Sequence, residues 1–282
     1  MLSIDALPTG QYAQVFNGSL KLHFHEYGKP DKKKPSLLFL HGSGPGASGY
    51  SNFRQNYPFL HDAGYHVLVV DYIGFGYSDK PRDFEYSGSN QVSILHELLV
   101  QRGVEQVVPI GNSLGGYYGL QFALTYPAMV PKLICMAPGG VEDVAAWVPE
   151  SPGLIAMSQA VAKGEFNSQS FRELLKLLVY DEAIITEEVI AERLPIAQAQ
   201  PREVYTRAVH DPIWKSLGEL KMPVLAFWGY HDQFIPVRHA LVMQEKIADC
   251  RVVVSNRAGH WFMIEEPQLF NRMCLDFLRD SD

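Results

Sequence analysis

The stretch with the clearest chemical potential is a serine flanked by glycines. Residues 111–115 read Gly-Asn-Ser-Leu-Gly, with an apolar run of strand type before them and a helical pattern after them. In this context the serine lies on a sharp strand-to-helix turn, with its hydroxyl projecting above a sheet. Side chains in place of Gly111 and Gly115 would collide with the neighbouring strand and helix. We therefore expect Ser113 to be a nucleophile rather than a serine that only caps a helix.

A serine nucleophile needs a base and an acid that orients this base. Two later loops supply candidates: Asp232 follows the apolar run Val224–Gly229, and His260 follows the apolar run 251–255. The order serine, acid, histidine along the chain is the one that a nucleophile on such a turn requires. His260 would take the Ser113 proton, while Asp232 would hold the ring in the right tautomer and stabilise its cation.

Other titratable residues fit this chemistry less well. His231 is adjacent to Asp232, but adjacent side chains in an extended loop point apart. His41 follows a strand and begins a glycine-rich loop, where we expect it to brace the loop. Asp71 also ends a strand, yet it precedes Ser113 in the chain, so the chain order assigns it a structural role.

The glycine-rich loop 41–46, His-Gly-Ser-Gly-Pro-Gly, is the second candidate element of the site. Gly42 and Gly44 let the backbone approach a substrate, which a Cβ would obstruct. The amides of Ser43 and Leu114 are the predicted oxyanion-hole donors, and losing one such donor costs about 3 kcal/mol of transition-state stabilisation. A phosphate-binding loop is the rival interpretation, but it fails because no Lys-Ser or Lys-Thr pair follows.

These residues need a sheet that brings them to one edge. Short apolar runs alternate with longer amphipathic stretches, which predicts an α/β fold with a mainly parallel sheet flanked by helices. An Asn-Gly turn between residues 11–17 and 20–27 predicts a hairpin. Strands buried on both faces are predicted at residues 37–40, 66–71, 106–110, 132–136, 224–228 and 251–255, and helices at 88–102, 114–125, 237–247 and 267–278.

Residues 141–211 break this alternation. Their pattern is helical at 171–179, 186–191 and 203–209, without a convincing strand. A helical block between two halves of a parallel sheet is typical of a lid over the strand ends. We therefore predict a core of residues 1–140 and 212–282 and an inserted helical cap of residues 141–211. Trp147, Met157, Phe171 and Leu175 of this cap are expected to shape the substrate pocket.

The overall composition narrows the range of partners. The net charge of −7 gives no reason to expect nucleic acid. Cys135, Cys250 and Cys274 are too few and too scattered for a disulfide framework or a zinc site, and no metal or cofactor is expected. Cys135 and Cys250 adjoin apolar strands, so we expect buried thiols there. Asp5 and Pro8 interrupt any signal-peptide pattern, and no apolar stretch reaches the about 18 residues of a membrane span. A cytoplasmic protein without a membrane partner is expected.

At these motifs the chain resembles the α/β-hydrolase superfamily over its whole length. More narrowly it resembles the meta-cleavage-product hydrolases, which hydrolyse C–C bonds in aromatic degradation. The matching segments are residues 41–47, 51–53, 111–116, 138–140 and 259–261, with 185–188 and 191–193 in the cap. The resemblance implies a vinylogous 1,5-diketone substrate of the 2-hydroxy-6-oxo-hexa-2,4-dienoate type, carrying a carboxylate. Water would cleave it into a 2-hydroxypentadienoate and a carboxylic acid.

The resemblance also implies substrate-binding residues. Arg193 matches the family's ligand for the substrate carboxylate, Asn52 and Asn112 match residues that contact the dienol end, and Trp261 matches a substrate-packing residue. A carboxylate in an apolar pocket needs a cation, and arginine offers a two-pronged match. From the residues alone, Arg193 could equally be a solvated helix residue paired with a neighbouring glutamate. Asn112 could brace the turn, and Trp261 could be core packing. Family members are commonly dimers or larger, which leaves a homo-oligomer open.

Two other functions use the same fold. A carboxylesterase would use the same triad on small esters, and the sequence Phe262–Glu265 is closer to general esterases than to the Ala-Gln-Trp-Glu often found in the C–C hydrolases. An esterase for neutral esters would have no use for a buried arginine in the cap. A non-catalytic ligand-binding protein is the minor alternative, against which an intact triad counts. Haloalkane dehalogenase chemistry is disfavoured because it uses an aspartate where this chain has Ser113.

Overall fold

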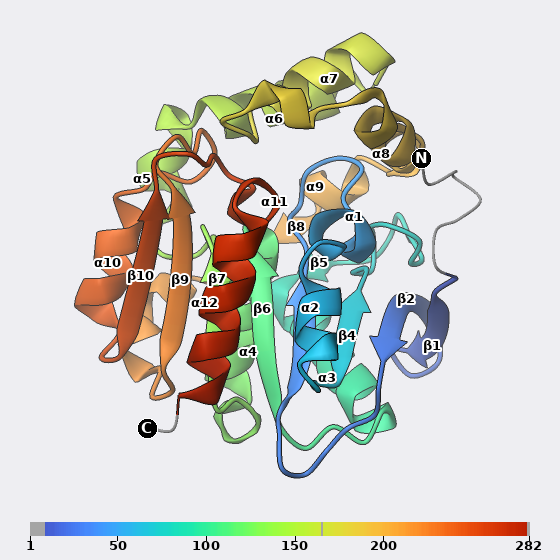
Figure 1. Ribbon diagram of the computed structural model, residues 1–282. Helices are drawn as coiled ribbons and strands as arrows, with labels where there is room; N and C mark the ends of the chain where they lie inside the picture. Colours follow the sequence, from blue (N-terminus) through green and yellow to red (C-terminus); the bar gives the residue numbers. More distant parts are fainter. Residues whose placement is uncertain (1–8, 165, 281–282) are drawn as a thin grey trace.

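An eight-stranded sheet runs through the protein, and helices cover both of its faces (Figure 1). The structure is a computed structural model and describes residues 9–164 and 166–280. The sheet order is β1-β2-β4-β3-β6-β7-β9-β10, in which β2 pairs antiparallel with β1 and β4 and the remaining neighbours are parallel. The strands are β1 (Gln11–Val15), β2 (Leu20–Tyr27), β3 (Ser36–Leu40), β4 (Val67–Val70), β6 (Val107–Asn112), β7 (Leu133–Met136), β9 (Val224–Gly229) and β10 (Cys250–Ser255).

The predicted hairpin and parallel strands are confirmed, with two corrections. Phe16, Asn17 and Gly18 all have positive φ (55°, 57° and 79°), so they form the hairpin turn and β1 ends earlier than predicted. The predicted burial of the last strand on both faces is wrong, because β10 is an edge strand whose residues are partly or fully exposed. For the same reason Cys250 is only partly buried, whereas Cys135 on the central strand β7 is buried as expected.

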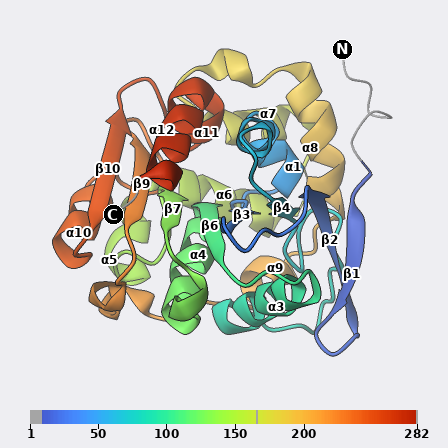
Figure 2. The ribbon, with the colours of Figure 1, turned by 60° about the horizontal axis from the view of Figure 1, so that its bottom comes forward.

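Helices lie on both faces of this sheet (Figure 2). One face carries α3 (Gly88–Gln101) and α4 (Leu114–Thr125), and the other carries α1 (Gly49–Phe53), α2 (Tyr57–Asp62), α11 (Phe262–Glu265) and α12 (Pro267–Arg279). Helix α10 (His239–Lys246) packs beside β9 and β10. The long predicted helices thus agree with α3, α4, α10 and α12 within about two residues at each end, the usual uncertainty of helix bounds.

The described residues of the cap, defined as residues 141–211, include the α-helices α5 (Val144–Trp147), α6 (Pro152–Lys163), α7 (Ser168–Lys176), α8 (Glu187–Ala199) and α9 (Glu203–Thr206). Figure 1 shows α6, α7 and α8 above the carboxyl ends of the strands. Thr186 caps α8 by accepting from the amide of Val189, and two glutamates in the first turn favour this start. The division at residues 140 and 212 stays a prediction.

The prediction of a cap without strands is wrong at its end. The helix expected over residues 203–209 ends at Thr206, and Ala208–Val209 form β8, which pairs with β5 (Tyr86–Ser87) of the core. A strand of two residues has no periodicity to detect. The N-terminal segment, for which no signal peptide is predicted, includes residues 1–8, which lie outside the described residues. In the described part of the chain, no helix is both long and apolar enough to cross a membrane.

Candidate active site

Ser113 lies on a strained turn between β6 and α4. Its backbone has φ 57° and ψ −114°, a conformation that non-glycine residues rarely adopt and that is typical of functional sites. A Cβ on Gly111 would collide with the carbonyl oxygen of Gly115, and one on Gly115 would collide with that of Leu40 in β3. The two glycines therefore permit the close contact of strand and helix that holds the serine in this position.

His260 and Asp232 are joined as the sequence predicts. The Nδ1 atom of His260 lies 2.7 Å from Oδ2 of Asp232, and both side chains are buried. The other carboxylate oxygen accepts the amides of Phe234 and Ile235 at 2.7 and 2.9 Å, which fixes the orientation of the carboxylate. This arrangement leaves Nε2 of the imidazole as the nitrogen available for proton transfer.

Ser113 and His260 line the same cavity. Among the described residues no hydrogen bond joins the Ser113 hydroxyl to the imidazole, and such bonds are often long before substrate binds. The ring of His260 stacks on Phe234, with centroids 5.0 Å apart, and the adjacent amide of Trp261 donates to the carbonyl of Leu178 in the cap at 3.0 Å. The cap therefore contributes to the placement of the base.

The amides of Ser43 and Leu114 have no acceptor within the described structure, so both are available to an oxyanion. The Ser43 carbonyl accepts the hydroxyl of Tyr205 at 2.8 Å, which holds this peptide group in one orientation. Gly46 has φ +75°, and a Cβ there would lie 2.5 Å from the carbonyl oxygen of Arg193. The loop thus packs directly against α8 of the cap.

A small cavity of about 20 Å³ lies beside Ser113. It brings together predicted residues from six separate segments. It is lined by Gly42, Ser43, Gly44, Ala47, Asn52, Asn112, Ser113, Leu154, Met157, Leu178, Arg193, Phe234, His260 and Trp261. Leu154, Leu178 and Phe234 were missed, because an apolar type alone does not distinguish a cavity wall from core packing.

Arg193 is the buried cation of this cavity. Only 3% of the Arg193 surface is exposed. Its Nη2 donates to the Ser51 carbonyl at 2.9 Å and to Oδ1 of Asn52 at 3.1 Å. The guanidinium lies 4.4 Å from the centroid of the Trp261 ring, a cation–π contact. The structure thus excludes the interpretation of Arg193 as a solvated helix residue. Asn52 and Trp261 both contact the guanidinium directly, so the three side chains form one group in the cavity wall.

The charge of Arg193 has no carboxylate partner among the described residues, since Glu192 instead pairs with Arg54. Burial lowers the pKa of Arg193 to about 10, which still leaves the guanidinium positive at neutral pH. A buried charge without a counterion is costly, so this cavity is suited to an anionic group.

Asn112 both braces the turn and presents an acceptor. Its Nδ2 donates to the carbonyls of Met136 and His260 at 3.3 and 3.2 Å. Its Oδ1 is buried without a hydrogen-bond partner in the described structure, next to the position that a Cβ on Gly42 would occupy. An unpartnered buried acceptor in a cavity wall is a candidate ligand for a hydroxyl group.

A second, larger cavity of about 320 Å³ shares Ser43, Ser113 and Leu154 with the first. Trp147 lines this larger cavity, and Met157 lines the smaller one, as expected for pocket residues. Phe171 and Leu175 line neither cavity and are buried in the core instead. The prediction that these two side chains shape the pocket is therefore wrong, since neither forms its wall; Phe171 instead packs beside Gly46 and supports the oxyanion loop from the cap side.

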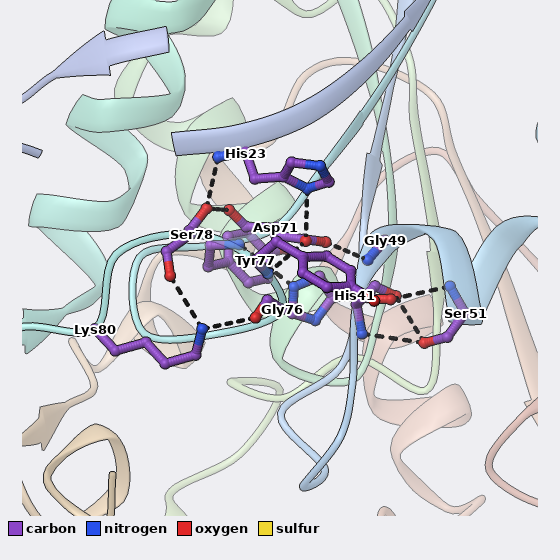
Figure 3. A network of polar contacts seen from close by, with 11 residues as sticks. His23, His41, Gly49, Ser51, Asp71, Gly76, Tyr77, Ser78 and Lys80 are labelled. Atoms are coloured by element: carbon purple, nitrogen blue, oxygen red, sulfur yellow. Dashed lines mark hydrogen bonds and ion pairs between the residues drawn. The ribbon is translucent and has the colours of Figure 1, made fainter. Parts of the chain in front are cut away.

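Asp71 has the structural role that chain order predicts (Figure 3). Its carboxylate accepts from His23 at 2.8 Å, from the Gly49 amide at 2.7 Å and from the Tyr77 amide at 2.9 Å. Burial opposes its ionisation, yet the hydrogen bond from His23, the nearby His41 ring and the Gly49 amide hold the pKa of Asp71 below its usual value. His41 braces its loop through Nδ1, 2.7 Å from the Gly42 carbonyl oxygen, and burial lowers the pKa of His41.

Comparison with known proteins agrees with this fold. The model of the alpha/beta hydrolase family matches residues 37–273, so the chain belongs to this family. The 2-hydroxy-6-oxo-6-phenylhexa-2,4-dienoate hydrolase of Comamonas testosteroni is 32% identical over 96% of both chains. A 2-hydroxy-6-oxononadienedioate/2-hydroxy-6-oxononatrienedioate hydrolase of Paraburkholderia phymatum is 33% identical, again over 96% of both. A 2-hydroxy-6-oxo-6-phenylhexa-2,4-dienoate hydrolase of Rhodococcus sp. strain RHA1 superposes with a TM-score of 0.80 at 27% identity, covering 96% of this chain and all of that one. The resemblance inferred from the motifs is confirmed, and the protein is a hydrolase.

Proposed function

We propose that the protein cleaves a carbon–carbon bond in a ring-fission product of the 2-hydroxy-6-oxo-hexa-2,4-dienoate type, with Ser113 as the nucleophile. The names of its relatives, which are dienoate hydrolases, support this substrate class. Ser113, His260 and Asp232 would act as the triad, and the Ser43 and Leu114 amides as the oxyanion hole. A cytoplasmic location and a homo-oligomeric state stay predictions.

The buried guanidinium of Arg193 is the observation that carries the proposal. It is charged, lacks a carboxylate partner within the described residues and lies in the wall of the cavity that contains Ser113. The carboxylate at one end of a dienoate would supply the missing counterion, and the unpartnered Oδ1 of Asn112 would accept a hydrogen bond from the 2-hydroxyl. A neutral ester would leave both groups unpaired.

The chemistry follows from this binding orientation. The dienol must first become a ketone, so that the carbon next to the 6-oxo group can accept the electron pair of the breaking bond; His260 would move this proton. Ser113 would then add to the 6-oxo carbon as His260 takes its proton, and the two amides would hold the oxyanion. Cleavage of the C–C bond sends its electron pair into the conjugated ketone, and His260 returns its proton to the resulting dienolate, so that 2-hydroxypentadienoate leaves and an acyl group remains on Ser113. Water then adds to this acyl group as the neutral His260 takes its proton, and His260 passes that proton to Ser113 as the carboxylic acid is released.

A direct comparison of two substrates tests this function. We expect the purified protein to bleach a coloured 2-hydroxy-6-oxo-6-phenyl dienolate with a kcat/KM at least 10-fold above that for p-nitrophenyl butyrate. Both reactions are followed by absorbance under one set of conditions. Fast cleavage of the ester with the dienolate untouched would make the protein a carboxylesterase.

Replacing Arg193 with methionine should weaken the use of the dienolate in particular. Loss of a buried charge-assisted contact costs about 2–4 kcal/mol, so kcat/KM for the dienolate should fall roughly 30- to 1000-fold. The value for p-nitrophenyl butyrate should change far less, since that ester has no carboxylate. Arg272→Met, at an exposed position of α12, is the matched control. An equal loss on both substrates would mean that Arg193 is not a carboxylate ligand.

A further inference from the structure

The proposed function leaves open the group that is released as the carboxylic acid. If the dienoate carboxylate lies at Arg193 and the 6-oxo carbon at Ser113, the rest of the substrate must extend beyond Ser113. The larger cavity begins at Ser113 and does not include Arg193. Its volume of about 320 Å³ is in the range of small-ligand pockets. This cavity is therefore where the acyl group would lie.

The cavity has an apolar wall. Trp147 of α5 and Leu154 of α6 face it from the cap, and Tyr117 of α4 and Ile235 face it from the core. Trp147 is only 4% exposed, and its ring makes an edge-on contact with His239. Such a wall favours an alkyl or aryl group by the area that it removes from water.

Three carboxylates line the same cavity, and a histidine, a backbone amide and a side-chain amide contact them. Glu142 lies 2.7 Å from Nε2 of the buried His239. Asp143 accepts an amide of α5 at 3.1 Å, and Asp211 accepts the side-chain amide of Gln121 at 2.5 Å. Within the described structure, no lysine or arginine forms an ion pair with any of them.

Positive charge in this cavity is scarce. Burial lowers the pKa of both His239 and His210, which disfavours the cationic form of each ring. Lys215 is the one lysine in the wall; like Asp143 it is exposed, and its ammonium lies 5.1 Å from the Trp214 ring. Lys246 lies against the same ring and donates to backbone carbonyls, but it does not line the cavity. The wall therefore carries three negative groups against one positive group.

On the basis of the proposed function, we propose that the acyl group is uncharged and that the Glu142, Asp143 and Asp211 carboxylates exclude acyl groups ending in a carboxylate. Such a group would face like charges in a partly enclosed cavity, where Coulomb repulsion is stronger than in water. The two ends of the substrate would thus be sorted by charge: the anionic end at Arg193 and the neutral end between Trp147 and Ile235.

Two matched substrate pairs test this inference. The first pair is the 6-phenyl dienoate and the dienoate whose 6-substituent ends in a carboxylate. The second pair is p-nitrophenyl butyrate and p-nitrophenyl hemisuccinate. These esters share the same leaving group, and their acyl groups differ in charge. We expect a kcat/KM at least 10-fold higher for the neutral member of each pair.

Glu142→Gln should lower the ratio of the two kcat/KM values, neutral over anionic, at least 3-fold. Glu219→Gln, an exposed control with the same change in net charge, should leave this ratio unchanged.

The outcomes separate the two proposals. If neither dienoate is cleaved but the butyrate ester is preferred over the hemisuccinate, the proposed function fails and the charge selectivity holds. If the protein cleaves the anionic substrate of a pair with a kcat/KM equal to or above that of the neutral substrate, the charge selectivity is overturned. A fall of this kcat/KM for the anionic substrate in Lys215→Gln would then assign Lys215 as a ligand for a second carboxylate.

Discussion

Replacing Ser113 with alanine should lower kcat by about 10⁴- to 10⁶-fold on any substrate, equivalent to roughly 5–8 kcal/mol of transition-state stabilisation. The hydroxyl is the group that adds to the 6-oxo carbon, and alanine has no group that could do so. The remaining turnover would come from the oxyanion hole and from substrate binding. Binding itself should persist, because Arg193 and Asn112 are untouched.

The fold should tolerate this change. The Ser113 hydroxyl makes no hydrogen bond in the described structure, and alanine has the same backbone preference as serine at φ 57°. We expect the free energy of unfolding to change by less than about 1 kcal/mol. Single-turnover absorbance measures cleavage, and titration of the dienolate measures its Kd, which should stay within about 3-fold of the original. Ser89→Ala, at an exposed serine, is the control. Comparable turnover by Ser113→Ala would remove Ser113 from the mechanism.

Much of the site could be predicted because its signals are local. The turn at Ser113 depends on glycines two residues away, which prevent collisions with the adjacent carbonyl groups of Leu40 and Gly115. Asp232 and His260 were predicted from their positions after two apolar runs, since parallel strands deliver their following loops to one edge of a sheet. These inferences need only the order of elements and the direction of the strands.

The remaining features depend on packing between distant segments. The orientation of Arg193 is set by contacts with Ser51 and Trp261. Ser51 lies 142 positions earlier in the chain, and Trp261 lies in the loop that follows the last strand of the core. The helical sequence pattern around Arg193 would fit an exposed helix equally well. Similarly, β8 exists only because Tyr86–Ser87 lies beside it, and Phe171 is directed toward the oxyanion loop rather than the substrate. Neither residue type nor spacing contains this information.

Replacing Asp232 with asparagine should lower kcat by about 10⁴-fold while leaving the site nearly unchanged in shape. The asparagine oxygen can still accept the amides of Phe234 and Ile235, which now hold Oδ1 of Asp232 at 2.7 and 2.9 Å. Its NH₂ group would then point at Nδ1 of His260. The imidazole would have to accept there and carry its proton on Nε2, so that it could no longer take the proton of Ser113.

This result would separate orientation of the base from simple structural support. We expect the thermal unfolding midpoint of Asp232→Asn to stay close to that of the original protein, the Kd for the dienolate to change little, and kcat alone to collapse. Asp276→Asn, at an exposed position of α12, is the matched control. A modest loss of kcat, under about 10-fold, would show that Asp232 does not set the tautomer of His260. The buried pair at 2.7 Å would then be a structural contact, and the histidine would be held for catalysis by its stacking on Phe234 and by the cap contact of Trp261.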